Sequence, residues 1–243
     1  MSGFVPSHYL VRTVDLPGSV ARCREAGFTV VWGSDPETAY NAMIYLRAGG
    51  FIELFDPPMD EKAIDTVRAG AERGDPMMQR YHRWATGAGF CDFALETSES
   101  LADAVAGKNL PPLRPATRVR ADGVTTAREL CTPPDAELPF MMGPYDPPED
   151  LGPEKTGHAN GAGAVVGLQL DHPNPVDYAE RLQTLLGPCP MDAAGNGVTL
   201  TQSGFSIRID RADAFAHRRI VLDRCPDDWQ SLGLAIEPAG SRS

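Results

Sequence analysis

The stretch that decides the fold opens with Ser7-His8-Tyr9-Leu10-Val11 and closes with Phe51-Ile52-Glu53-Leu54-Phe55. Each of these segments predicts a strand, because β-branched and aromatic residues favour an extended backbone. The residues between them predict one helix followed by two more strands, which gives the order βαβββ. His8 and Glu53 therefore lie on the outermost strands of one unit, and an imidazole and a carboxylate are both able to bind a metal ion.

The helix inside this unit has clear start and stop signals. Asp15 can accept hydrogen bonds from the free amides of a first turn, and Pro17 lies in that turn, where a missing N–H costs nothing. Gly27 predicts the end of the helix, because glycine readily adopts a positive φ. The two strands that follow are expected at 28–32 and 38–46.

This combination of element order, spacing and helix-boundary residues resembles the vicinal oxygen chelate superfamily, and specifically its glyoxalase-like branch. Asn41 adds to the resemblance, because the segment 38–46 is similar to the Asn-containing third strand of glyoxalase-like domains. The resemblance implies an α+β fold in which repeated βαβββ modules form curved mixed sheets, as in glyoxalase, bleomycin resistance and dihydroxybiphenyl dioxygenase proteins. It also implies that His8 and Glu53 form half of a mononuclear site and that Asn41 contacts substrate.

The βαβββ order recurs further along the chain, and internal repeats of this kind indicate related structural units. A degenerate copy opens with a strand at 91–95, and a third copy opens with a strand at 164–170. The expected organisation is module 1 at 1–58, a helical connection at 59–88, degenerate module 2 at 89–146, a Pro/Gly-rich loop at 147–162, and module 3 with a C-terminal extension at 163–243. The long irregular stretch 143–161 is either a cover over a site or a plain linker.

The superfamily pattern requires a second module to complete the metal site. In module 2, Asp92 aligns with His8, whereas the last strand of that module offers only the thioether sulfurs of methionine. In module 3, a valine falls at the His8 position and Arg208 falls near the Glu53 position, and neither side chain binds a cation. The resemblance thus implies a site of His8, Glu53 and Asp92 for Fe²⁺, Mn²⁺, Co²⁺, Ni²⁺ or Zn²⁺. The alternative is that no metal is bound.

Without a metal, His8 and Glu53 either hydrogen-bond each other as part of the core or act together as a general acid and base. A buried carboxylate needs a partner, because an isolated buried charge is costly. A desolvated Glu53 is expected to have a raised pKa and to accept a proton near neutral pH. Cys91 is a further candidate for catalysis, although free cysteines are usually small buried hydrophobes.

Two other segments resemble parts of glyoxalase-like domains. Arg118 and Arg120 share one face of a strand that ends in an Asp-Gly turn, and they are candidates for binding a substrate carboxylate or phosphate. The alternative is a surface hairpin. His158, in a His-Ala-Asn-Gly-Ala segment, is a candidate substrate contact, proton donor or further ligand. The remaining histidines, His82, His172 and His217, are expected at the surface.

Composition limits the classes of partner. The net charge of −11, from 22 basic and 33 acidic residues among 243, disfavours nucleic acid and anionic membranes as partners. Five scattered cysteines, no Cys-x-x-Cys pair and no apolar leader favour a reducing cytoplasm. The expected partner is a small molecule, and a homodimer is compatible with the resemblance.

Two classes of function remain open from the sequence. The first is an enzyme that acts on a small oxygenated metabolite, with lyase, isomerase or cyclase chemistry, through His8 and Glu53. The second is a resistance-type protein that binds or sequesters a small molecule without chemistry and without metal. The loss of ligand positions in module 3 favours the second class, whereas the retention of His8 and Glu53 favours the first.

Overall fold

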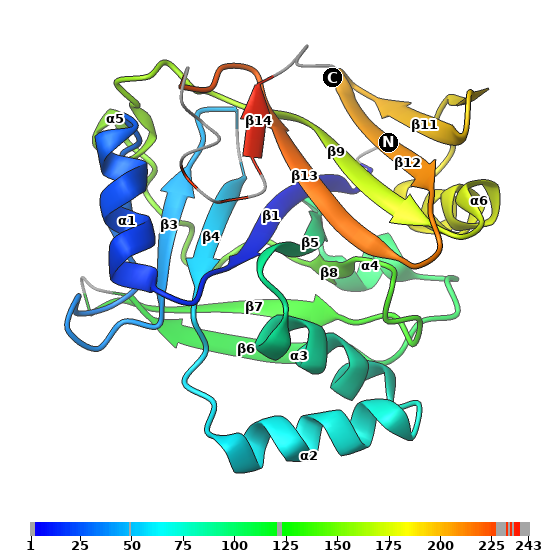
Figure 1. Ribbon diagram of the computed structural model, residues 1–243, viewed down its shortest axis with the longest axis horizontal. Helices are drawn as coiled ribbons and strands as arrows, with labels where there is room; N and C mark the ends of the chain where they lie inside the picture. The colour runs from blue at the N-terminus through cyan, green and yellow to red at the C-terminus, as the bar shows by residue number, and fades with distance from the viewer. Residues whose placement is uncertain are drawn as a thin grey trace.

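The computed structural model describes residues 3–48, 50–120 and 123–226, together with 232, 234 and 236–238. Within these residues the chain forms an eight-stranded sheet and a six-stranded sheet with few helices (Figure 1). The expected α+β fold of curved mixed sheets built from βαβββ repeats is thereby confirmed. No helix in this part of the chain is both long enough and apolar enough to cross a membrane.

The eight-stranded sheet contains the first two repeats, in the strand order β2-β3-β4-β1-β5-β8-β7-β6. The antiparallel pairing of β1 with β5 joins the first repeat to the second. Asp15 caps α1 by accepting from the Gly18 amide at 3.0 Å, as its sequence position predicts. The elements of the first repeat are β1 (Val5–Arg12), α1 (Leu16–Glu25), β2 (Val31–Trp32), β3 (Asn41–Tyr45) and β4 (Phe51–Phe55), and those of the second are β5 (Gly89–Glu96), α4 (Leu101–Val105), β6 (Arg114–Val119), β7 (Thr125–Cys131) and β8 (Phe140–Met142).

The six-stranded sheet is the third repeat with two added strands, in the order β10-β11-β12-β9-β13-β14. Here β13 pairs antiparallel with β9 and takes the place that β5 has beside β1. The elements are β9 (Val165–His172), α6 (Pro175–Leu186), β10 (Met191–Ala194), β11 (Gly197–Gln202), β12 (Phe205–Arg211), β13 (Ala216–Leu222) and β14 (Ile236–Pro238).

The main core lies between the two sheets. Alternation along β1 sends Tyr9 and Val11 into this core, where they join apolar residues of the six-stranded sheet such as Leu168 and of both α1 and α6. His8 and Leu10 point to the opposite face of the same strand. The eight-stranded sheet is therefore packed on one face, and its other face is available for a cavity.

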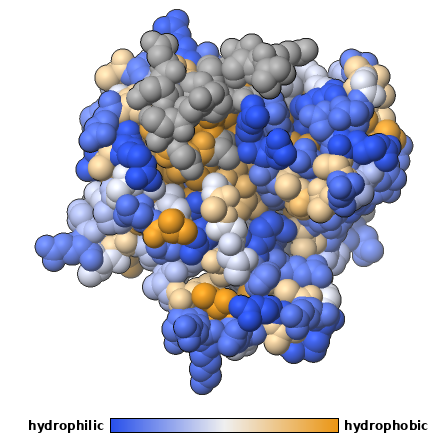
Figure 2. Space-filling view, in the orientation of Figure 1, coloured by the Kyte–Doolittle hydropathy of each residue, from blue (hydrophilic) through white to orange (hydrophobic). Residues whose placement is uncertain are grey.

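Two helices of the connection between the first and second repeats cover that other face. They are α2 (Glu61–Glu72) and α3 (Pro76–Thr86), capped by Asp60 and Asp75 respectively. They lie below the sheet in Figure 1, and Figure 2 shows a hollow between the α2 segment and the body of the molecule. The break between the helices falls at Gly74, where φ is +81°.

Residues 143–161 close one side of the curved sheet and include the short helix α5 (Pro153–Thr156). The Glu149 carboxylate accepts from the hydroxyl of Tyr45 on β3 and from the guanidinium of Arg118 on β6, each at 2.9 Å. β3 is the second strand in the sheet order and β6 is the last, so one carboxylate connects the two ends of the sheet. The sheet is thus curled toward a barrel, and the segment 143–161 bridges its two sides through Glu149.

The expectation that His172 and His217 lie at the surface is wrong. His172 is buried and stacks on Tyr178, with 5.0 Å between ring centroids, because β9 continues beyond the expected end of the strand. His217 lies on β13 against Phe90, with 5.0 Å between centroids, and both of its ring nitrogens are buried. An irregularity between His217 and Arg219 breaks the alternation of β13 and hides the strand pattern in the sequence.

Candidate functional site

His8 and Glu53 converge inside the curved sheet. The register aligns Glu53 on β4 with Leu10 on β1, which puts Glu53 on the same face as His8. His8 Nε2 lies 2.5 Å from Glu53 Oε2, and the side-chain amide of Asn41 donates to Glu53 Oε1 at 2.6 Å. The strand positions inferred from the sequence therefore bring all three side chains into one hydrogen-bonded group.

Aromatic rings fix the orientation of His8. The Phe51 ring stacks on the imidazole with 4.3 Å between centroids, and the Phe140 ring meets it edge-on at 5.8 Å. The other ring nitrogen, Nδ1, is buried and has no hydrogen-bond partner among the described residues. The side chain of His8 is 6% exposed and that of Glu53 is 15% exposed, so the carboxylate is the more accessible member of the pair.

Glu53 is held as a carboxylate and not as a neutral acid. Burial raises the pKa of Glu53, but hydrogen bonds from His8 and Asn41 and the charge of Arg128 outweigh burial, and the pKa lies below its usual range. The expected raised pKa is therefore wrong, because desolvation is only one of the influences at this position. The negative charge on Glu53 also favours the tautomer of His8 that carries its proton on Nε2.

The pair opens into a cavity of about 530 Å³ between the sheet and the helices α2 and α3. Cavities of this size bind small organic molecules. Most lining residues are apolar or aromatic; they include Leu10, Tyr40, Phe55, Pro57, Met59, Val67, Met77, Tyr81, Trp84, Leu130 and Phe140. The charged or titratable groups at the wall are His8, Glu53, Arg80 and Arg128, together with the phenols of Tyr40 and Tyr81.

Arg128 brings a positive charge to the wall of this cavity. Its guanidinium donates to the Tyr145 hydroxyl and lies over the Tyr145 ring, with 4.6 Å from Cζ to the centroid. A further contact joins Nη1 to the sulfur of Met142 at 3.3 Å. Arg128 forms no ion pair with a carboxylate in the described part of the chain, so its charge remains available to a ligand anion.

Asp92, the expected third ligand, is occupied by cations from α3. Its Oδ2 accepts from Arg80 at 2.5 Å, from Arg83 at 3.2 Å and from the indole of Trp84 at 2.9 Å. Burial raises the pKa of Asp92, but the guanidinium groups of Arg80 and Arg83 outweigh burial and keep the pKa below its usual range. The side chains of Arg80 and Asp92 are each 1% exposed, so this ion pair is a fixed part of the core.

Strand registers identify the positions equivalent to His8 and Glu53 in the other repeats. In the second repeat, Phe140 on β8 pairs with Ala94 as Glu53 pairs with Leu10, so a phenylalanine stands at the Glu53 position. In the third repeat, Gly167 and Arg208 occupy the two positions, which corrects the expected valine to a glycine and retains the expected arginine.

These positions do not provide the donor set that a mononuclear metal of the superfamily pattern requires. Only His8 and Glu53 remain as donors, because Asp92 is neutralised by two guanidinium groups and Phe140 has no donor atom. Among the described residues, no group of three or more His, Cys, Asp and Glu side chains is placed to hold a metal ion. The chain therefore does not fit a metal ion held in the superfamily manner.

In the described part of the chain, none of the other candidates from the sequence hydrogen-bonds to His8 or Glu53. Arg118 is paired with Glu149, and Arg120 lies beyond the end of β6, next to residues outside the described part. His158 accepts from the Thr29 amide at 3.0 Å through Nδ1 and contacts the Tyr45 carbonyl at 2.9 Å through Nε2, so both of its nitrogens bind backbone. Burial lowers the pKa of His158. Burial also raises the pKa of the Cys91 thiol, which opposes formation of a nucleophilic thiolate.

Several residues of the site are not among those that the sequence singles out. Arg80, Arg83 and Trp84 have the spacing of one helical face, which is a usable signal for a shared target. Arg128 and the apolar Leu130 are two positions apart and share one face of β7, so an inward-facing arginine is also detectable in principle. The contact of Tyr145 with Arg128 depends on the path of an irregular segment, which sequence patterns do not predict.

Comparison with solved structures shows the same fold at low sequence identity. A hypothetical protein from Staphylococcus aureus is 13% identical with a TM-score of 0.61, and the match covers 89% of each chain. A Mn(II)-bound glyoxalase from Novosphingobium aromaticivorans is 13% identical with a TM-score of 0.50, over 91% of this chain and 66% of the other. The 2,3-dioxygenase LapB from Pseudomonas sp. KL28 is 11% identical with a TM-score of 0.50, over 91% and 75%.

Curated protein sequences give no significant match to this chain. The family described as "Glyoxalase-like domain" matches residues 7–186, which is most of the chain and includes His8, Asn41, Glu53 and Asp92. The sequence resemblance inferred from the first 55 residues is thereby confirmed. The chain belongs to the family of glyoxalase-like domains of the vicinal oxygen chelate superfamily.

Proposed function

We propose that this protein is an enzyme that moves a proton on a small oxygenated molecule, with His8 and Glu53 as its acid–base pair and without a metal ion. The observation that carries the proposal is the Glu53 carboxylate, which is oriented by His8 and Asn41 at the wall of a largely apolar cavity. A carboxylate held in this way is a positioned base, and it is the more exposed member of the pair.

Arg128 supplies the second half of the chemistry. A guanidinium without a carboxylate partner among the described residues can bind a substrate oxygen through two parallel N–H donors. Removal of a proton from a carbon next to a carbonyl leaves negative charge on the carbonyl oxygen, and Arg128 stabilises that charge. Glu53 returns the proton to a neighbouring atom in an isomerase, or the carbanion expels a leaving group in a lyase.

The substrate class follows from the walls of the cavity. The aromatic and apolar lining favours a compact carbon skeleton, and Arg128 favours a carbonyl, carboxylate or enol oxygen at one end. Arg80 and Arg83 bring two positive charges to the single negative charge of Asp92, so this fixed cluster keeps a net positive charge near the wall. This charge opposes entry of a divalent cation and favours an anionic ligand.

The test is exchange of carbon-bound hydrogen in D₂O, because the signal comes from the substrate itself and does not depend on which product forms. Small keto acids, hydroxyketones and aldehydes are incubated with chelator-treated protein, and deuterium at the carbon next to the carbonyl is followed by proton NMR. We expect wild-type protein to catalyse exchange, Glu53→Gln to abolish it, and Glu129→Gln, an exposed carboxylate on β7, to leave it unchanged. Exchange that appears only after Mn²⁺ is added contradicts the metal-free proposal.

The second candidate is a sequestering protein, and the missing ligand positions at Asp92 and Phe140 favour it. Such a protein binds a ligand in the cavity of about 530 Å³ but catalyses no exchange in any bound compound. Glu53→Gln then changes affinity alone. Ligand binding detected by NMR, together with unchanged carbon-bound protons, identifies this function and rejects the enzyme.

A further inference from the structure

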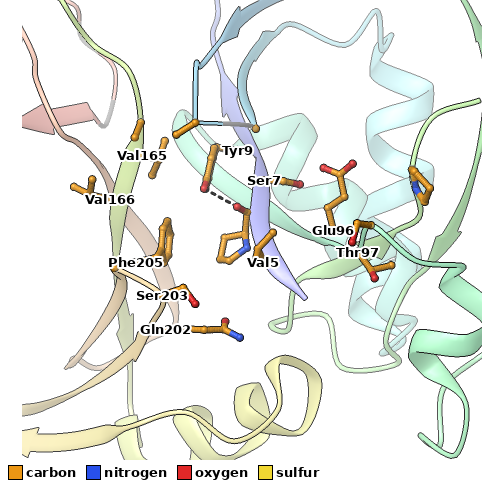
Figure 3. Close-up of a pocket in the computed structure, with 17 residues that line it drawn as sticks. Val5, Ser7, Tyr9, Glu96, Thr97, Val165, Val166, Gln202, Ser203 and Phe205 are labelled. Carbon is orange, nitrogen blue, oxygen red and sulfur yellow. Dashed lines mark hydrogen bonds between the residues drawn. The ribbon is translucent and has the colours of Figure 1, made fainter. Parts of the chain in front are cut away.

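A second cavity, of about 590 Å³, lies where the start of β1 meets the six-stranded sheet (Figure 3). It shares no lining residue with the cavity at His8. In Figure 3, Val165, Val166 and Phe205 of the six-stranded sheet form one side, and Glu96 and Thr97 at the end of β5 form the other. The two sheets together therefore build this cavity.

Two polar atoms at its wall are buried without partners. The Ser7 hydroxyl and the Gln202 Oε1 are both out of contact with solvent, and neither has a hydrogen-bond partner among the described residues. Ser7 as a residue is only 3% exposed. An unpaired buried polar atom is unfavourable, so two of them at one cavity indicate a place where a ligand completes the hydrogen bonding.

The turn at the cavity wall is strained. Ser203 has a φ of +49°, and in the described part of the chain it is the single residue other than glycine with a positive φ. Ser203 and Gly204 connect β11 to β12 directly after the Gln202–Phe205 pair, in a two-residue turn where asparagine or glycine is usual. Backbone strain of this kind is often kept where it serves a binding site.

The chemistry of the lining selects one class of ligand. The lining contains no Lys, Arg or His, whereas Glu96 has a half-buried side chain whose carboxylate makes no hydrogen bond or ion pair with any described residue. The unpaired groups are thus a carboxylate, an amide oxygen and a hydroxyl, all of which accept hydrogen bonds. The apolar side is provided by Val165, Val166 and the ring of Phe205, which stacks on Tyr9 with 6.5 Å between centroids.

We propose that this cavity is a binding site for a small organic cation, a protonated amine with an apolar or aromatic body. Glu96 is its counter-ion, and the Ser7 hydroxyl and the Gln202 amide oxygen accept further N–H bonds. The apolar body lies against Phe205 and the two valines of β9. The net charge of −11 adds a general attraction for cations and none for anions.

The test uses three probes of one shape that differ in charge: benzylammonium, benzyl alcohol and benzoate. Each is titrated into ¹⁵N-labelled full-length protein at neutral pH, and amide shifts are followed by NMR. We expect benzylammonium to shift amides of β1, β9 and the Gln202–Phe205 turn, with at least about 10-fold weaker binding of benzyl alcohol and no binding of benzoate.

Variants separate this site from the cavity at His8. Glu96→Gln should weaken benzylammonium binding at least about 10-fold, since a charge-assisted hydrogen bond is lost, whereas the exposed neighbour Glu99→Gln should bind as wild type does. Unchanged spectra elsewhere show that Glu96→Gln is folded. Equal binding of benzoate or benzyl alcohol, an undiminished affinity in Glu96→Gln, shifts confined to residues around Glu53, or no shifts with benzylammonium each overturn the proposal.

Discussion

Replacement of Arg80 by methionine should destabilise the protein by about 3–5 kcal/mol, the usual cost of breaking a buried ion pair by removing one partner. Both side chains of the Arg80–Asp92 pair are 1% exposed, so water cannot replace the lost contact. Arg83 and Trp84 still donate to Asp92 in this variant, which places the expected cost near the lower end of that range. Asp92→Asn should cost a similar amount, because it leaves two guanidinium groups without their anion.

The double variant Arg80→Met/Asp92→Asn tests whether the two residues form one unit. Its cost should be smaller than the sum of the single costs by at least ~1 kcal/mol, because each replacement removes a charge whose shortest ion pair the other has already broken. Urea denaturation measures all three values, with an unchanged m-value as evidence for the same native state. The exposed pair Arg68–Asp65 is the control and should cost less than about 1 kcal/mol. Additivity within ~0.5 kcal/mol in the buried pair would refute the reasoning.

Three further predictions concern metal affinity, pH and the segment 143–161. Arg80→Met should bind Mn²⁺ more tightly than wild type, seen as loss of the free-ion EPR signal, because a fixed positive charge has been removed; equal affinity contradicts this. Burial and the charge of Arg83 lower the pKa of His217 from 6.5 to about 3. As the pH falls, His217 therefore takes up a proton in the unfolded chain before it does so in the folded chain. Stability should then be full above pH 6.5 and should fall by up to ~1.4 kcal/mol per pH unit below it, and a denaturation series should show a weaker fall in His217→Phe. Glu149→Gln should cost about 1–3 kcal/mol in urea denaturation, whereas exposed Glu154→Gln should cost almost nothing.

Local signals predicted the first repeat well. Asp15 and Gly27 bound α1 as expected, and the alternation of β1 and β4 placed His8 and Glu53 on one face. Such features depend on neighbouring residues alone, so a sequence contains them directly. The strand expected at 28–32 is shorter in the structure, where β2 covers Val31–Trp32, because only these residues pair with β3.

The partners of charged residues could not be predicted in the same way. Asp92 has the strand position of a ligand, but its contacts come from Arg80 and Arg83 on a helix whose docking depends on the whole tertiary fold. The pKa of Glu53 similarly depends on burial, on the hydrogen bonds from His8 and Asn41 and, to a smaller extent, on Arg128, which lies 75 positions later in the sequence. Strand position alone therefore indicates where a carboxylate lies and not which charge faces it.

The contact between Glu149 and Tyr45 also has a consequence for folding kinetics. The two residues are separated by 104 positions, so their contact requires closure of a long loop and is expected after the sheet itself has formed. Interactions absent from the transition state slow unfolding and leave the folding rate unchanged. Glu149→Gln should accordingly speed loss of the native state, with unfolding roughly 10-fold faster for each 1.4 kcal/mol lost and the folding limb of the chevron unmoved. The Glu149 carboxylate thus slows unfolding, and it affects the lifetime of the folded state more than the rate at which that state forms.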